Sequence, residues 1–252
     1  ASDGTQKPGG AVDPASGTVS PDGRYVTYNS YSSALVANDT GYDIALDGGG
    51  DLYLAGSTNA GDFPTTGGAF DTSFNGASDA FLCRMTPAGT LTWSTFLGGL
   101  QGDGATAVAV NGTKVLGTGY TTSDDLPPTV GAYDTIYSGT QDVFISRFTT
   151  AGALDWLTYL GGSGSDTLPS VAIDASGAVY MAAIAGSPDM PTTAGVPTPT
   201  IQGNSDGYAC KISTDGASLV WGTYLGTLQQ DAANGIALTG TTVVVVGYVS
   251  GS

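Results

Sequence analysis

One phrase recurs along this chain at nearly constant intervals, and it constrains the fold more than any other feature. The phrase reads WSTFLGG, WLTYLGG and WGTYLG, at residues 93–99, 156–162 and 221–226. It contains all three tryptophans, which are 63 and 65 residues apart: Trp93, Trp156 and Trp221. A fixed period of this length is the signature of a repeat protein, in which each repeat is one supersecondary unit.

Three further landmarks share this period. Asp-Phe-Pro, Asp-Leu-Pro and Asp-Met-Pro begin at Asp62, Asp125 and Asp189. A phrase of the form Asp-x-Phe/Tyr begins at Asp79, Asp142 and Asp206. An apolar phrase resembling Val-Ala-Val-Asp begins at Ile44, Val108, Val171 and Ile236. Independent landmarks with one spacing exclude coincidence, so the chain consists of about four copies of one unit.

Each unit reads as four short strands. The first carries the Val-Ala-Val-Asp phrase, the second is a run such as DLYLAGST, the third resembles DAFLCRM, and the fourth holds the tryptophan. A long loop rich in Pro, Gly and Thr separates the second strand from the third. Alternation in the fourth strand places four residues of each unit on one face, namely Leu91, Trp93, Thr95 and Leu97, with counterparts from Leu154 and Leu219 onward. No window shows helical periodicity, so we expect an all-β protein.

Tandem four-stranded antiparallel units indicate a β-propeller, and a β-solenoid, whose coils are usually shorter, is the main rival. We expect one domain over residues 1–252. Its blades fall at about 40–102, 103–165 and 166–230, and a fourth consists of 231–252 joined with 1–39.

The two ends of the chain read as complementary halves of one unit. SPDGRYVTYNSY at 20–31 aligns with TPAGTLTWSTF at 86–96, with Tyr28 in the tryptophan position. The chain ends with VVVVGYVSGS, which is a second strand and the start of a loop. The sequence therefore predicts a four-bladed ring closed by strands from both termini, which leaves no exposed sheet edge. A segment of a larger ring is the alternative.

Composition limits the partners. The formal net charge is −16, and every one of the 22 acidic residues is aspartate. Such a chain repels nucleic acid and anionic membrane surfaces, and it has no run of 18 apolar residues that would insert into a membrane. We expect another protein or a surface glycan as partner, with self-assembly as a further option.

Residue types also limit the chemistry. The chain has no histidine, which removes Ser-His-Asp catalysis and ordinary zinc sites. Cys83 and Cys210 occupy the same strand position in units that are not adjacent, so we expect two unpaired, buried thiols. We predict no catalytic residue and no cofactor. Arg84, Arg147 and Lys211 also recur at one position, and we expect them to pair with nearby aspartates.

Aspartates recur after each fourth strand, and repetition in every unit favours a structural role in locking the crossover. The alternative is Ca²⁺ binding, since carboxylates suit hard cations. The metal candidates are Asp39, Asp103, Asp166 and Asp231.

Features that break the repeat symmetry are the better ligand candidates, because they are not explained by a role in every unit. Asp124 and Asp125 form the one adjacent pair of acids, and the long loops carry Phe63, Phe70, Tyr133 and Tyr137. Recognition is often carried by loops on a rigid scaffold, although such loops also pack on their own blade.

Two stretches carry a resemblance to a known family. YDIALDGGGDLYLAGSTNAGDFPTTGGAFDTSFNGASDAFLCRM at 42–85 and TYLGGSGSDTLPSVAIDASGAVYMAAIAGSPDMPTT at 158–193 resemble the bacterial SBBP repeat, a "seven-bladed β-propeller" family. The resemblance extends over about 40–250, with a degenerate continuation at 17–39. It implies a propeller fold and an extracellular or cell-surface location. The family name implies seven blades, whereas this chain offers four.

These observations favour a non-enzymatic extracellular or cell-surface scaffold, adhesion or interaction module. A carbohydrate-binding lectin is the first alternative. The second is a secreted glycan hydrolase or lyase with two aspartates as acid and base, which requires carboxyl groups about 5–10 Å apart.

Overall fold

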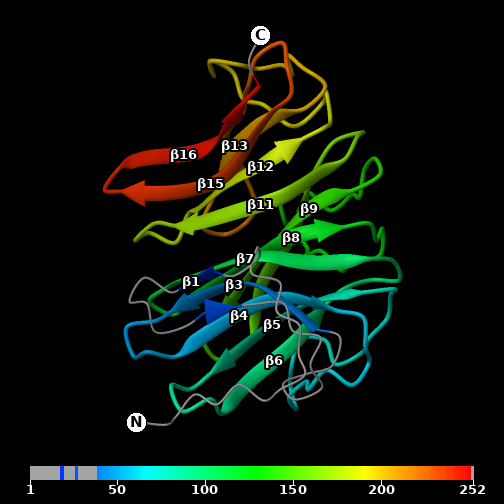
Figure 1. The fold of residues 1–252 in the computed structure, drawn as a ribbon, viewed down its shortest axis with the longest axis vertical. Helices are drawn as coiled ribbons and strands as arrows, with labels where there is room; N and C mark the ends of the chain where they lie inside the picture. Colours follow the sequence, from blue (N-terminus) through cyan, green and yellow to red (C-terminus); the bar gives the residue numbers. More distant parts are fainter. Residues whose placement is uncertain (1–17, 20–25, 28–38, 251–252) are drawn as a thin grey trace, which may run out of the picture.

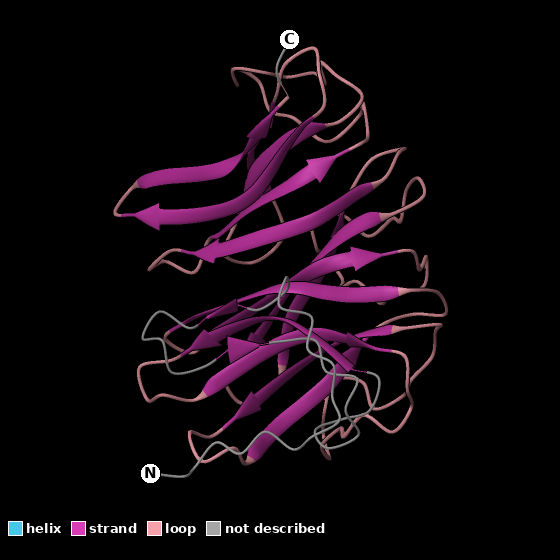
Figure 2. Cartoon of the chain, viewed as in Figure 1, coloured by secondary structure: helices cyan, strands magenta, loops and turns pink. Residues whose placement is uncertain are grey.

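The computed structural model describes residues 18–19, 26–27 and 39–250, and these residues form strands, turns and loops without a helix (Figure 2). The first sheet contains β3 (Asp39–Leu46), β4 (Leu52–Thr58), β5 (Asp79–Met85) and β6 (Leu91–Leu97). The second contains β7 (Asp103–Asn111), β8 (Lys114–Thr121), β9 (Asp142–Thr149) and β10 (Leu154–Leu160). The third contains β11 (Asp166–Ile173), β12 (Val179–Ala185), β13 (Asp206–Ile212) and β14 (Leu219–Leu225). Two strand pairs remain, β15 (Asp231–Thr239) with β16 (Thr242–Val249), and β1 (Thr18–Val19) with β2 (Val26–Thr27).

Each four-stranded sheet is an antiparallel meander in which the strands follow one another in chain order. The all-β prediction is thus confirmed for the described residues, and β3 begins one residue before the predicted start of its unit at residue 40. Consecutive sheets stack face to face (Figure 1). The first strands of the units, β3, β7, β11 and β15, contact one another in that order and form the inner side of the stack.

The tryptophans fill the space between neighbouring sheets. Trp93 belongs to the core between the first and second sheets and stacks on Phe148 with ring centroids 6.0 Å apart. Trp156 occupies the same place between the second and third sheets. Large aromatic side chains bury much apolar surface, so one tryptophan per unit anchors each sheet to the next.

The leucine two positions before each tryptophan does not share its face, contrary to the alternation read from the sequence. A β-bulge separates the two residues: Met85 pairs with Leu91, but Arg84 pairs with Trp93. Leu154 accordingly packs toward the first sheet, whereas Trp156 faces the third. An extra residue in one strand reverses the side on which the preceding residue lies.

Both glycines of the recurring Leu-Gly-Gly are required by close contacts. A Cβ on Gly98 would lie 2.5 Å from Cγ of Asp79, and Gly161 and Gly226 face Asp142 and Asp206 in the same way. A Cβ on the second glycine, Gly162, would lie 2.5 Å from Asp189 Oδ1 in the following strand connection. The two glycines therefore mark the crossover after each fourth strand, where the backbone passes close to a buried aspartate.

The long loops run along the outer edge of each sheet. Asp71 N donates to Thr95 Oγ1 at 2.9 Å, and Phe96 N donates to Asp71 O at 3.1 Å. Asp134 with Thr158 and Thr198 with Thr223 repeat this arrangement. The threonine of the recurring phrase thus ties down the loop, and the loop covers an edge that would otherwise be open to pairing.

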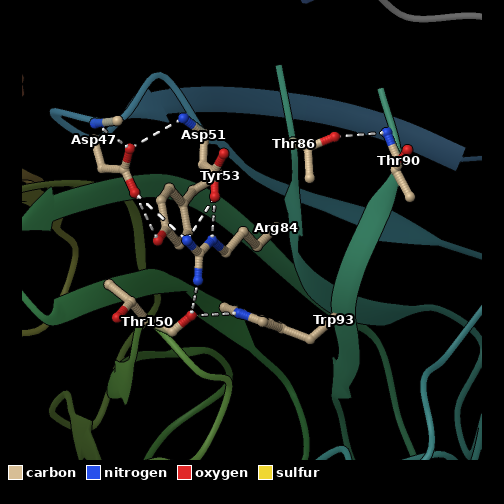
Figure 3. Close-up of polar contacts among 9 residues, drawn as sticks. Asp47, Asp51, Tyr53, Arg84, Thr86, Thr90, Trp93 and Thr150 are labelled. Carbon is tan, nitrogen blue, oxygen red and sulfur yellow. Dashed lines mark hydrogen bonds and ion pairs between the residues drawn. The ribbon is translucent and has the colours of Figure 1, made fainter. Parts of the chain in front are cut away.

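Arg84 joins the first two sheets (Figure 3). Its Nε and Nη2 donate to Asp51 Oδ2 at 2.9 and 2.5 Å, while Nη1 donates to Thr150 O at 2.6 Å in the turn after β9. Trp93 Nε1 donates to the same carbonyl at 3.0 Å. The second and third sheets are joined alike, by Arg147, Trp156 and the Thr214 carbonyl.

The predicted sheet shared by both termini is not present among the described residues. β15 and β16 pair only with each other, and so do β1 and β2, which lie against β3 (Figure 1). The structure describes two residues of each N-terminal strand, and none of these four pairs with β16. Most of residues 20–31, including Tyr28, lie outside the described residues.

The alignment behind that prediction is nevertheless visible in the register. Val19 pairs with Val26, as Met85 pairs with Leu91 at the end of the first complete sheet. β1 and β2 lie against β3 as β5 and β6 lie against β7. They correspond to the outer half of a sheet, and β15 with β16 corresponds to an inner half.

Candidate functional site

All four inner strands are interrupted at the same place. The pairing register shifts between Gly41 and Asp43 in β3 and between Ala105 and Ala107 in β7. It also shifts in β11 before Ser170 and in β15 before Gly235. A bulge turns a side chain out of the regular sheet pattern and is common beside functional sites.

The residues at these four bulges line one cavity of about 480 Å³. We call it the axial pocket; its walls include Tyr42, Asp43, Thr106, Tyr120, Leu168, Pro169, Ser170 and Asn234. The bulge residues differ in every unit, being tyrosine, threonine, leucine-proline and asparagine. The pocket is therefore the place where the inner side of the stack departs most from repeat symmetry.

Side chains beside the bulges also link the inner strands. Asp43 Oδ2 accepts a hydrogen bond from Val108 N at 2.9 Å, which joins β3 to β7. Thr106 Oγ1 donates to Pro169 O at 3.1 Å. Ser170 Oγ accepts from Ile236 N at 3.3 Å, so all three junctions between the inner strands are bridged.

Leu168 has an unusual backbone conformation in the pocket wall. Its φ is +50°, and its side chain is 52% exposed. A non-glycine residue in the left-handed region costs about 1–3 kcal/mol, and such residues concentrate at ligand-binding sites. The fold therefore holds an apolar side chain outward in a strained conformation.

The pocket wall contains one acidic group among the described residues, the carboxyl of Asp43. Burial raises the pKa of the Asp43 carboxyl, although the Val108 N–H opposes the shift. Burial also raises the pKa of Tyr120, as do the nearby Tyr42 phenol and the Asp103 carboxylate. Of the lysines and arginines that the structure describes, none lines the pocket.

The repeated aspartates after each fourth strand lie at separate crossovers. Asp103 Oδ2 accepts from Gly99 N at 2.8 Å and from Ser123 Oγ at 2.9 Å. Asp166 makes the same contacts with Gly162 and Ser187, and Asp231 accepts from Thr227 and Ser250. Within the part of the chain that the structure describes, no three His, Cys, Asp or Glu side chains are grouped as a metal site requires. The hydrogen bonds of Asp103, Asp166 and Asp231 fix three crossovers, while the crossover before Asp39 lies outside the described residues.

The aromatic loop candidates pack on the sheets. Phe63 is 7% exposed and stacks on Phe81, with centroids 4.4 Å apart. Phe70 lies edge-on to Phe148 at 6.2 Å. Tyr137 lies edge-on to Tyr159 at 6.1 Å, and Tyr133 packs against the core between the second and third sheets. These side chains hold the loops in place and do not converge on one site.

Asp124 and Asp125 are both exposed and lie at a loop beside the crossover. Asp125 Oδ1 accepts from Leu100 N at 2.9 Å, which fixes the crossover after β6. Neither residue lines the axial pocket.

The predicted thiols and ion pairs are confirmed. Cys83 and Cys210 are free and buried, and burial raises the pKa of each to about 12, so neither is an activated nucleophile. The recurring cations each pair with an aspartate of their own sheet: Arg84 with Asp51, Arg147 with Asp155 and Lys211 with Asp174.

The sequence analysis missed the residues of the axial pocket. Tyr42, Thr106, Pro169 and Asn234 are 64, 63 and 65 positions apart, which is the repeat spacing. They stand two residues before the Val-Ala-Val-Asp phrase in each unit and differ in residue type. An aligned position that varies among otherwise similar units could have indicated a binding site. Only the bulge shows that these side chains leave the sheet toward one cavity.

Comparison with known families supports the repeat. Residues 31–64 match the beta-propeller repeat family SBBP. The SBBP match covers β3, β4 and the start of the following loop, and it confirms the resemblance read from the sequence. It includes Tyr42 and Asp43 of the axial pocket.

One curated relative is similar over about half of the chain. It is Regulatory protein FlaEY of Caulobacter vibrioides, 33% identical over 125 residues. The matched region is 48% of this chain and 13% of that protein, so this chain corresponds to a small part of its relative. In the described residues, no helix is both long enough and apolar enough to cross a membrane.

Proposed function

We propose that this chain is a non-enzymatic interaction module that binds its partner through the axial pocket. The SBBP match supports a repeat scaffold of the kind used in protein interactions. The pocket carries the proposal, because four structurally equivalent bulges present different side chains to one cavity. Scaffold roles account for the repeat-equivalent aspartates and tryptophans, but not for this variation.

We further propose that the sheets are blades of a propeller at the cell surface or outside the cell. Support comes from the inner-half and outer-half register of the two terminal hairpins, which would complete one blade if the ring closes. The low lysine and arginine content and high Gly, Ser and Thr content are typical of secreted bacterial proteins.

The test of the interaction module uses the whole chain as an immobilised bait for surface extracts of the source cells. Wild-type bait is compared with Tyr42→Ala, which changes the pocket, and with Asp124→Asn, which changes an exposed loop. We expect at least one protein retained by the wild type and by Asp124→Asn but not by Tyr42→Ala. Identical retention by all three baits would contradict the proposal.

A lectin is the second candidate, because tyrosines, a carboxylate and an amide in one pocket are also suited to a sugar. A glycan array probed with the same three proteins separates this function from protein binding. A glycan hydrolase is less well supported, since acid and base catalysis needs a pair of carboxyl groups and, of the described residues, Asp43 alone brings a carboxyl group to the pocket wall.

A further inference from the structure

Among the described residues, the acidic group of the axial pocket has no cation beside it. Of the six lysines and arginines, Lys7 and Arg24 lie outside the described residues. The other four are paired with aspartates elsewhere: Arg84, Lys114, Arg147 and Lys211. Asp43, by contrast, has its carboxylate hydrogen-bonded to a neutral backbone N–H. A partly buried carboxylate of this kind is stabilised by a positive charge brought from outside.

The same chain shows how it accommodates a cation. Lys211 Nζ donates to the phenol oxygen of Tyr180 at 2.7 Å, lies 4.7 Å from the centroid of that ring, and lies 3.6 Å from Asp174 Oδ2. Arg84 lies 5.6 Å from the Tyr53 ring while it pairs with Asp51. Both sites combine an aspartate with a tyrosine, and a cation over a tyrosine face is stabilised beyond its ion pair. The axial pocket contains Asp43 together with Tyr42 and Tyr120.

The remaining walls suit the rest of a long basic side chain. Leu168 and Pro169 offer apolar surface for the methylene stem that lysine and arginine bury. The Asn234 amide oxygen is an additional acceptor for a guanidinium or ammonium donor. A cavity of about 480 Å³ is at the small end of ligand pockets and has room for one such side chain. The net charge of −16 draws basic partners toward the protein.

We propose that the axial pocket receives one lysine or arginine side chain from a basic segment of a partner protein, with Asp43 as its counter-ion. The proposal rests on the interaction module above and names the chemistry of its ligand. Asp43 then has two roles, bridging β3 to β7 and recognising the partner.

The two roles can be separated because the third unit already contains a neutral version of the bridge. Ser170 accepts from Ile236 N as Asp43 accepts from Val108 N. Asp43→Ser copies that solution, and Asp43→Asn also keeps an acceptor oxygen. Both variants remove the charge and retain the bridge, and their melting temperatures report whether the fold is intact. Asp124→Asn is the matched control, with the same change in net charge at an exposed loop.

The probe is acetyl-Gly-Arg-Gly-amide, titrated into the full chain with the tyrosine ring signals followed by NMR. Its neutral counterpart contains citrulline in place of arginine. We expect saturable binding of the arginine peptide to the wild type and to Asp124→Asn, and binding about tenfold weaker for both Asp43 variants and for the citrulline peptide.

Equal binding of the arginine and citrulline peptides would overturn the proposal. So would undiminished binding by folded Asp43→Ser and Asp43→Asn, or an equal loss in Asp124→Asn, which would show an effect of net charge alone. If Tyr42→Ala still abolishes partner retention, such a result rejects the ligand class and leaves the interaction module standing. If peptide binding does not depend on Asp43 and Tyr42→Ala also retains the partner, the interaction module is rejected as well.

Discussion

At the scale of single residues, buried aspartates organise the crossovers between sheets. Asp79 and Asp142 are fully buried at the start of third strands and accept hydrogen bonds from backbone N–H groups of the preceding loop. They face Gly98 and Gly161 of the recurring phrase, so a glycine and an aspartate form one structural unit. This arrangement makes both partners sensitive to small changes.

Gly98→Ala is expected to destabilise the protein, because its Cβ would lie 2.5 Å from Asp79 Cγ. Overpacking of this kind costs about 1–3 kcal/mol, which urea denaturation measures as a lower midpoint. Gly67→Ala is the control, since nothing lies within 4 Å of its Cβ. Equal midpoints for the two variants would show that the crossover tolerates a methyl group.

Asp142 makes the stability depend on pH. Burial, together with the charges of Asp166 and Asp134, raises the pKa of Asp142 from its ordinary value of 3.8 to about 7. A raised pKa means that the stabilising contribution is complete below about pH 3.8 and is lost as the pH rises through about 7. We therefore expect the free energy of unfolding to be lower at pH 8 than at pH 5.

Asp142→Asn isolates this effect, because asparagine stays neutral at both pH values. The pH-dependent loss should shrink by roughly 2–3 kcal/mol relative to the wild type, measured by denaturation at pH 5 and pH 8. Asp124→Asn should leave the loss unchanged. A wild-type protein as stable at pH 8 as at pH 5 would refute this account of Asp142.

At the scale of elements, each sheet is incomplete without its neighbour. Trp93 and Trp156 reach into the following sheet, where Gly152 and Gly216 lie against their rings and a turn carbonyl accepts the indole N–H. Trp221 has no such outer hairpin among the described residues and is less buried. The repeated tryptophan therefore contributes different amounts to the free energy of unfolding in different units.

Trp93→Ala is expected to cost about 3–5 kcal/mol, as is usual for large-to-small changes in a core. Trp221→Ala should cost clearly less, because the Trp221 ring contacts Tyr180 of its own sheet and no following turn covers it in the part of the chain that the structure describes. Chemical denaturation of both variants checks the comparison. Equal losses would indicate that Trp221 packs against a partner sheet in solution.

Much of this scale could be predicted from the sequence. Strand order, sheet membership and the tryptophan anchors follow from the repeat, because four landmarks fix one register. The prediction that Leu91 and Trp93 share one face of the strand was wrong, because sequence alternation does not reveal the bulge between them. The axial pocket was missed for the same reason: Tyr42 and Asn234 look like ordinary strand residues until their bulges are known.

At the scale of the whole molecule, the open question is the ring. Val19 stands where Met85 does in the first complete sheet, and Val243 stands where Leu52 does. Leu52 and Met85 are cross-strand partners. A closed ring would therefore bring Val19 opposite Val243, although the structure shows the two hairpins in separate sheets.

A double variant tests this closure. Val19→Cys with Val243→Cys should form a disulfide under mild oxidation if the ring closes, because paired strand positions meet the distance that the bond requires. Val26→Cys with Val243→Cys is the control, since Val26 would lie one strand farther away. The native thiols are buried and unactivated, which keeps the background low. A monomer that stays reduced would show that the two terminal hairpins do not share a sheet.

On the inner strands, regular pairing holds the sheets together, while the bulge residues face the axial pocket. The side chains of Tyr42 and Asn234 lie at bulges and can be exchanged without a change in the regular strand pairing, whereas Thr106 also bridges β7 to β11. Duplicating a unit adds a further position with no new architecture. We expect single substitutions at these bulge positions to change which ligand the axial pocket accepts.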